Sequence, residues 1–180
     1  MSRDQLNPIY TMILTVVCVA FMLIGAAQNS VSLTLLPIAA LFIGYIYIIL
    51  HSPNRTGATV MTLGIFTGLG GASHGPGEIL QGNYPPTGIY IKAWPGLTIL
   101  NGEPAVTIIQ SLLVSGVLTI IVGIIVAVWA SYYVHRRHGG VILALLSLLL
   151  LLVGGGQIPP LFGIAAGFLA RRVNGVPSRG

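Results

Sequence analysis

Charge is the feature that this sequence has least of. Only 8 Lys and Arg and 3 Asp and Glu occur among its 180 residues, so 6% are charged and 54% are hydrophobic. A water-soluble domain normally carries about a quarter charged residues. No charged residue lies between Asp4 and Arg55, or between Glu103 and Arg136. These stretches exclude a soluble fold and a disordered chain, because so much uncharged apolar sequence needs lipid around it.

Cysteine is equally scarce, since Cys18 is the only one and lies in an apolar run. An intramolecular disulfide and paired-thiol redox chemistry are therefore excluded. The apolar runs also lack Asp, Glu, Lys, Arg and His, which proton relays, ion-coupled pumps and haem sites require. We predict no cofactor and no metal site. The net charge of +5 does not indicate nucleic acid as a partner, because the cytoplasmic loops of membrane proteins collect Lys and Arg.

Apolar runs divide the chain into spans. A membrane-crossing helix needs about 20 apolar residues, and runs of suitable length predict helices over 9–27, 31–50 and 105–133. A shorter, glycine-rich run predicts a fourth helix over 56–72. The first run also resembles a cleaved signal peptide, with Arg3 before it and small residues at its end. Whether the first helix is retained stays open at this point.

The connection over 73–104 is polar and rich in glycine and proline. Within it, residues 89–94 alternate between apolar and polar, Pro95 and Gly96 favour a turn, and residues 97–100 are apolar again. This pattern is typical of a short β-hairpin. We expect a small extracytoplasmic cap that contains this hairpin.

The last apolar segment, 141–170, is interrupted by glycine and proline at 154–160, so neither half is long enough to span alone. If the segment enters the membrane and returns, the basic residues of both termini and of the 136–137 loop share one face, which leaves only Lys92 on the other. The sequence thus predicts an all-α polytopic membrane protein, with residues 1–180 as a single transmembrane domain. It has four transmembrane helices and a broken or re-entrant fifth element, and both termini face the cytoplasm at the cell membrane.

Small residues recur at every fourth position of the predicted helix over 105–133. Such a row lets helix backbones approach, and its hydroxyls can bond across helices. Packing inside the chain, a seam between copies of the chain, and a polar conduction path all remain open. Two G-x-x-x-G pairs, Gly64 with Gly68 and Gly163 with Gly167, are expected by chance among 24 glycines, so we assign them no role. The row comprises Thr107, Ser111, Ser115, Thr119, Gly123, Ala127 and Ser131.

The interruption in the last segment is the best candidate for a solute site. Unwound backbone at membrane depth is stable only where protein or a wet cavity covers it, and carriers use such breaks for binding. The short helix over 56–72, which ends in glycines, is a candidate counterpart. The candidate solute residues are Gln110, Gly154, Gly155, Gly156, Gln157, Pro159 and Pro160.

A second candidate site lies in the loop after residue 72. Residues 71–75 match G-x-S-x-G, the pattern around a hydrolase serine, although no compact α/β core can form here to shape it. His74 and Glu78 have the spacing of one helical face, but the Gly75-Pro76-Gly77 sequence between them favours a turn. The members of this loop site are Ser73, His74, Glu78 and Glu103. We assign no catalytic residue.

Basic residues flank the last apolar segments and are expected to bind lipid phosphates at the cytoplasmic face. They are His135, Arg136, Arg137, His138, Arg171 and Arg172.

Three functions follow from these patterns. The first is a non-catalytic membrane subunit or homo-oligomer, in a larger membrane complex or by self-association. The second is a channel or carrier for a small neutral solute, built around the interrupted segments. The third is a membrane-embedded hydrolase or metal-dependent enzyme at Ser73, His74 and Glu78. The lipid bilayer is the expected partner in all three.

Overall fold

The computed structural model describes residues 3–28, 30–91 and 105–174. Within them the chain is mostly helical, and two strands form one small antiparallel sheet. Three helices are long and apolar enough to cross a membrane, and two further apolar helices are shorter. In chain order the elements are α1 (Arg3–Ala27), α2 (Val31–His51), α3 (Arg55–Ala72), α4 (Gly75–Leu80), β1 (Tyr90–Ile91), β2 (Ala105–Val106), α5 (Leu112–Tyr132), α6 (Gly139–Leu152) and α7 (Ile158–Asn174).

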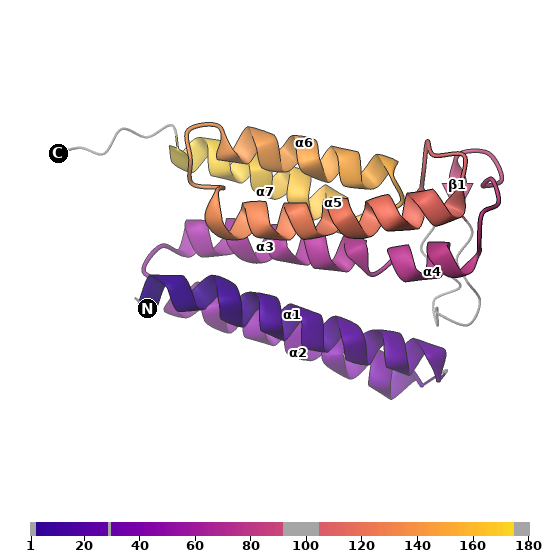
Figure 1. Cartoon of the computed structure of the whole chain (residues 1–180). Helices are drawn as coiled ribbons and strands as arrows, with labels where there is room; N and C mark the ends of the chain where they lie inside the picture. Colours follow the sequence, from indigo (N-terminus) through magenta and orange to yellow (C-terminus); the bar gives the residue numbers. More distant parts are fainter. Residues whose placement is uncertain (1–2, 29, 92–104, 175–180) are drawn as a thin grey trace.

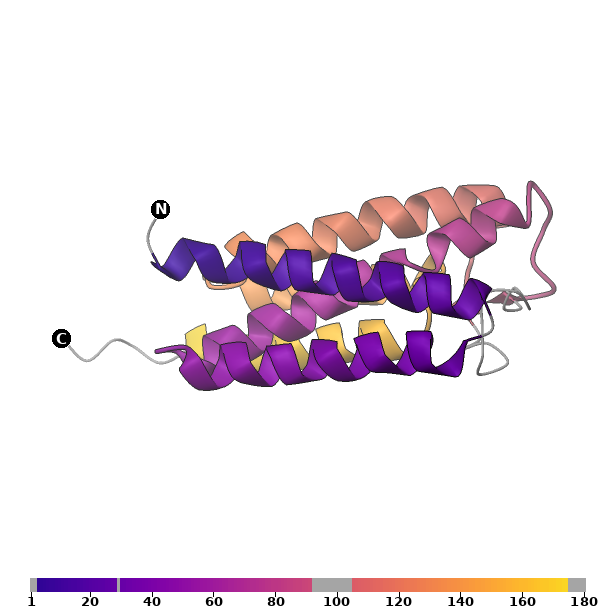
Figure 2. The same ribbon diagram turned by 90° about the horizontal axis from the view of Figure 1, so that it is seen from below.

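The long helices lie side by side along one axis (Figure 1). The pair α1–α2 forms one layer, α3 lies in the middle, and α5, α6 and α7 form the other layer. The view from below shows α3 crossing behind the α1–α2 pair at an angle (Figure 2). The start of α1 and the end of α7 lie at one end of the bundle, and α4 and β1 lie at the other. We call these the arginine end and the sheet end, because Arg55 begins α3 and Arg136 and Arg137 follow α5 at the first of them.

Polar side chains set where the helices begin. The Ser30 hydroxyl accepts a hydrogen bond from the Leu33 amide at the start of α2, and Asn54 Oδ1 accepts one from Gly57 N, at 2.8 Å, in the first turn of α3. The Ser111 hydroxyl does the same for Val114 at the start of α5. These side chains satisfy amide groups that have no partner inside the helix.

The helix predicted over 105–133 begins seven residues later, at Leu112. Ala105 and Val106 instead pair with Ile91 and Tyr90 as an antiparallel ladder. Because Ser111 is a good N-cap, the helix starts after it, and the apolar residues before it join the sheet. The sequence predicted residues 97–100 as the partner strand, and these lie outside the described part of the chain, which omits 92–104.

Two other boundaries differ from the predictions. Residues 75–77, predicted as a turn, instead begin the short helix α4, because Pro76 suits the first turn of a helix. The broken segment over 141–170 is two helices, α6 and α7, which pack side by side and run in opposite directions (Figure 1). Their lengths of 14 and 17 residues correspond to about 21 Å and 26 Å of helix.

The central helix α3 makes close contacts through glycine. A Cβ atom built at Gly68 would overlap the backbone of Gly123 and Ala127 on α5, and one at Gly64 would overlap Ala130. Eleven of the 18 residues of α3 are buried. Its neighbours are α5, α7, α1, α2 and α6, so α3 is surrounded by protein, which explains why its composition is less apolar than that of the outer helices.

The outer helices carry the exposed apolar side chains, among them Ile13, Phe21, Leu36, Ile43 and Ile125. A soluble monomer does not expose contiguous apolar surface of this extent. Where α1 and α2 meet, the hydroxyls of Thr15 and Tyr45 lie 2.7 Å apart and form a hydrogen bond between the two helices. This arrangement is compatible with a membrane location for the bundle.

Candidate functional site

The site begins at the break between α3 and α4. His74 connects the two helices, and Glu78 lies in the first turn of α4. Because residues 75–80 are helical, His74 and Glu78 are four residues apart on one helical face. No β-turn separates them. Gly75 and Gly116 allow α4 to approach α5 closely, since a Cβ atom at either glycine would overlap the carbonyl oxygen of the other. Glu78 is thereby held against the first turns of α5.

The break between α6 and α7 packs against His74 and Glu78. A Cβ atom at Gly154 would overlap both carboxylate oxygens of Glu78, and one at Gly156 would overlap the His74 ring. Both glycines have positive φ, 120° and 69°, a backbone conformation that side-chain-bearing residues rarely adopt. The structure therefore brings together two sites that the sequence analysis treated separately, the loop site and the solute site.

Hydroxyl groups complete the site from two further segments. The Val153 carbonyl oxygen accepts hydrogen bonds from Ser115 Oγ at 2.6 Å and from Thr119 Oγ1 at 2.7 Å. Ser115 Oγ also lies 2.9 Å from Thr107 Oγ1, and Thr107 pairs with Val153 in an isolated antiparallel bridge. We call this group the junction cluster, and it consists of His74, Glu78, Thr107, Ser115, Thr119 and the backbone of Val153, Gly154, Gly155 and Gly156.

Glu78 is the electrostatic anomaly of the junction cluster. It is 2% exposed, and neither of its carboxylate oxygens has a hydrogen-bond partner among the described residues. Burial raises the pKa of Glu78 above its ordinary value, and the nearby Ser115 hydroxyl acts in the opposite direction. A buried carboxylate without a partner is costly, and perturbed acids of this kind often mark functional sites.

The remaining members of the predicted loop site do not join this cluster. The Ser73 hydroxyl donates a hydrogen bond to the Gly70 carbonyl at 2.6 Å. Ser73 caps the end of α3 and is followed by a second helix, whereas a G-x-S-x-G nucleophile needs a strand that turns into a helix. Glu103 lies outside the described residues.

The predicted solute residues have mixed positions. Gly154, Gly155, Gly156, Pro159 and Pro160 are all buried, and Gln157 is half-buried. The Pro159 carbonyl accepts a 2.8 Å hydrogen bond from Thr67 on α3, which ties the start of α7 to the central helix. Gln110 is exposed before α5 and is not part of the junction cluster.

The row of small residues divides at the start of α5. Thr107 and Ser111 precede the helix, and Ser111 donates to Asn83 Oδ1 at 2.6 Å. The other five, Ser115, Thr119, Gly123, Ala127 and Ser131, are buried on α5. Gly123 contacts Gly68 and Ala72, and Ala127 contacts Gly68, so this part of the row faces α3 of the same chain.

The arginine end carries the residues predicted to bind lipid headgroups. His135, Arg136, Arg137, His138 and Arg171 are exposed there, and Arg172 lies next to them in α7. The Arg136 guanidinium lies 4.7 Å from the centre of the Tyr133 ring, which in turn stacks on Trp129. Stacked aromatic rings beside basic residues are typical of a membrane interface.

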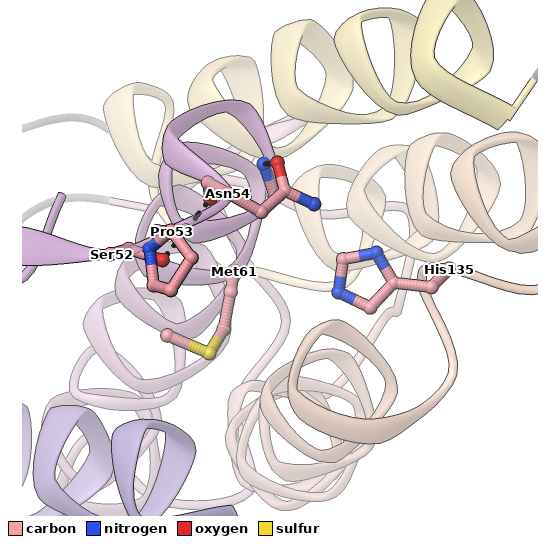
Figure 3. A pocket seen from close by; sticks show the side chains of 7 residues that line it. Ser52, Pro53, Asn54, Met61 and His135 are labelled. Atoms are coloured by element: carbon pink, nitrogen blue, oxygen red, sulfur yellow. Dashed lines mark hydrogen bonds between the residues drawn. The ribbon is translucent and has the colours of Figure 1, made fainter. Parts of the chain in front are cut away.

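A shallow pocket opens at this end, between the α2–α3 connection and the end of α5. It is lined by Ser52, Pro53, Asn54, Gly57, Ala58, Met61 and His135. Figure 3 shows the His135 ring pointing into the pocket from the side opposite Pro53 and Met61.

Sequence reasoning missed three parts of the junction cluster. The Val153 carbonyl cannot be recognised from its residue type, Thr107 was assigned to a helix, and Thr119 was assigned to the small-residue row and not to the loop site or the solute site. The signal available in the sequence was the run of three glycines at 154–156, which is consistent with close packing of another side chain against this backbone. That this group would be Glu78 required the three-dimensional contact.

No family model, curated protein or solved structure matches this chain significantly. Function must therefore be argued from the geometry. The junction cluster offers one ionisable acid, hydroxyl oxygens and a backbone carbonyl in a buried position. Such a group can bind a small polar species or a cation, or exchange a proton.

Proposed function

We propose that this chain is an integral membrane protein that binds a small polar solute at the junction cluster and carries it across the bilayer. The observation that supports this function is the buried, unpartnered carboxylate of Glu78 between two helix breaks. Membrane carriers use interrupted helices in this way, because unwound backbone supplies polar groups at membrane depth.

In the proposed topology, α1, α2, α3 and α5 cross the membrane, and α6 and α7 enter it and return. Three of these helices reach the length and hydropathy of a span. The fourth, α3, is shielded by its neighbours and is followed by α4, which extends it towards the sheet end. The proposal keeps both termini on the same face.

The charge distribution supports an orientation for this topology. Arg55, Arg136, Arg137 and Arg171 all lie at the arginine end, whereas Glu78 is near the sheet end. Short cytoplasmic loops are enriched in basic residues. We therefore place the arginine end in the cytoplasm of a cell-membrane protein, where its basic residues contact lipid phosphates.

Transport is tested with the purified protein in liposomes. Stopped-flow light scattering measures the permeability of the vesicles to small neutral solutes such as glycerol and urea. We expect the wild-type protein to raise this permeability and Gln157→Leu, at the edge of the junction cluster, to abolish the increase. Gln110→Leu is the matched control, because Gln110 is exposed and outside the cluster. Wild-type vesicles that are no leakier than protein-free vesicles would overturn the proposal.

A non-catalytic membrane subunit is the competing function, and one observation favours it. The three glycines at the tip of the α6–α7 pair are buried, so the tip is covered by protein in this conformation. Because Gly123 and Ala127 contact α3 and Ser115 and Thr119 bond to the end of α6, a partner chain would have to bind another face of α5. Tight liposomes, together with a detergent-solubilised particle larger than one chain, would support this function in place of transport.

A further inference from the structure

The state of Glu78 requires an explanation beyond the site itself. An ionised carboxylate that is buried without a partner is strongly unfavourable. Protonation removes the charge, but the resulting hydroxyl group then needs an acceptor, and neither carboxyl oxygen of Glu78 has a hydrogen-bond partner among the described residues. A bound cation satisfies both requirements, because it neutralises the carboxylate and fills the coordination of its oxygens.

The other atoms of the junction cluster are suitable ligands for such a cation. Ser115 and Thr119 contribute hydroxyl oxygens, which each donate their proton to the Val153 carbonyl and keep lone pairs for another partner. Ser115 is also near enough to Glu78 to affect its ionisation. Oxygen ligands of this kind favour hard cations.

The charge of the site selects a monovalent ion. Glu78 is the only acid in the junction cluster, and in the described part of the chain no three His, Cys, Asp or Glu side chains are grouped as ligands for a metal ion. A divalent cation would leave a net positive charge buried. A monovalent ion leaves the site neutral.

The backbone of the α6–α7 tip is shaped to the carboxylate. Gly154 has a φ of 120°, and any Cβ atom there would overlap both oxygens of Glu78. Glycine at 154 therefore allows the α6–α7 connection to pack directly against the Glu78 carboxylate. Gly154 is thus required by its contact with Glu78 as well as by its own backbone conformation.

From this geometry we propose that Glu78, Ser115 and Thr119 bind one small monovalent cation of the sodium type, with the two hydroxyls oriented by the Val153 carbonyl. The inference rests on the proposed solute site and names a charged species bound there. Binding exchanges a proton for the cation, so that a protonated Glu78 and a sodium ion give a sodium carboxylate and one free proton.

His74 is the other titratable group of the junction cluster. Its ring lies against Gly156, while α5 presents the Ser115 hydroxyl to Glu78 and the α6–α7 connection presents the Gly154 backbone. A positive charge on His74 disfavours a neighbouring cation. Protonation of either residue is therefore expected to weaken cation binding as the pH falls.

The first experiment measures binding to the intact wild-type protein in detergent. Radioactive sodium is titrated by a scintillation proximity assay, with choline chloride keeping the ionic strength constant. We expect saturable binding of about one sodium per chain, which weakens as the pH is lowered and is accompanied by proton release in weak buffer. Absence of saturable binding, or binding without proton release, would overturn the proposal.

Variants then locate the site. Glu78→Gln should abolish sodium binding, and Ser115→Ala should weaken it at least tenfold. Ser131→Ala is the matched control, because Ser131 is also a buried serine of α5 but donates to Ala127 of its own helix, and it should bind sodium like the wild type. Equal binding by Ser115→Ala and Ser131→Ala would overturn the assignment. If Glu78→Gln does not fold, the wild-type titration and the comparison of Ser115→Ala with Ser131→Ala still test whether sodium binds at this site.

The outcome is separable from that of the transport assay. Sodium binding without solute flux would support this inference and overturn the proposed function. Solute flux without sodium binding would do the reverse. If both assays fail, both proposals are overturned.

Discussion

Ser115 Oγ lies 2.6 Å from the Val153 carbonyl oxygen, which Thr119 Oγ1 approaches to 2.7 Å from the next turn of α5. One carbonyl group at the end of α6 is thus held by two hydroxyls of another helix. Because either hydroxyl alone satisfies the carbonyl, the loss of one is expected to be mild, and the loss of both leaves a buried acceptor without a partner.

This arrangement predicts a non-additive effect on stability. Ser115→Ala and Thr119→Val should each lower the free energy of unfolding by about 0.5–1.5 kcal/mol, and the double variant should exceed their sum by about 1 kcal/mol. Tryptophan fluorescence during thermal or denaturant unfolding in detergent provides the measurement. Strictly additive effects would show that the two hydroxyls do not share the carbonyl.

Glycine contacts between α3 and α5 give a second prediction. Gly68→Ala should lower the free energy of unfolding by about 1–3 kcal/mol, and with it the melting temperature measured in detergent, because its Cβ atom would overlap the Gly123 and Ala127 backbone. Gly70→Ala on the same helix is the control. Its Cβ atom would meet only Pro159 and Phe66 side-chain atoms at 3.6–3.7 Å, and alanine is the better helix former. Equal losses from both variants would contradict the proposed role of the contact.

These contacts show where sequence reasoning succeeded and where it stopped. The ends of the helices over 9–27 and 31–50 were predicted to within one residue except for the start of the first, which begins six residues earlier, at Arg3. An apolar run of suitable length is a strong signal, but the polar first turns of α1 lie outside it. The pair Gly64 and Gly68 was assigned no role, since its frequency is what chance gives in a glycine-rich chain. The structure shows both residues at the α3–α5 contact, which composition could not reveal.

The start of α5 and the junction cluster were missed for different reasons. Residues 105–111 are apolar enough to continue a helix, and only the pairing of Ala105 with Ile91 shows that they extend a sheet. Glu78 was placed in a polar loop because Gly75-Pro76-Gly77 favours a turn locally. Its burial depends on Gly154, 76 positions later in the sequence, and such a distant contact has no local signature.

The ionisation of Glu78 gives a third prediction, on the pH dependence of stability. Burial raises the pKa of Glu78 in the folded protein above its ordinary value of 4.5, so the folded state keeps a proton that the unfolded state has lost. The free energy of unfolding is then greatest below pH 4.5 and falls as the pH rises towards the folded-state pKa. Unfolding of the sodium-free protein in choline buffers measures this fall. The Glu78→Gln variant should not show this fall in the free energy of unfolding. If the variant shows the same pH dependence as the wild type, a group other than Glu78 causes it.

A fourth prediction concerns topology and uses the native Cys18, which is buried in the α1–α2 contact. In a Cys18→Ala background, single cysteines are introduced at Tyr84, Arg137 and Arg171, which are exposed at the sheet end, after α5 and near the end of α7. If α6 and α7 enter the membrane and return, a membrane-impermeant maleimide added to intact cells should label Tyr84→Cys and leave Arg137→Cys and Arg171→Cys unlabelled until the membrane is opened. The basic residues at the last two positions favour the cytoplasm.

Labelling of Arg171→Cys but not Arg137→Cys in intact cells would show that the α6–α7 pair does not return to the face it started from, and the proposed topology would be wrong. Labelling of all three before the membrane is opened would contradict the bilayer location of the whole bundle.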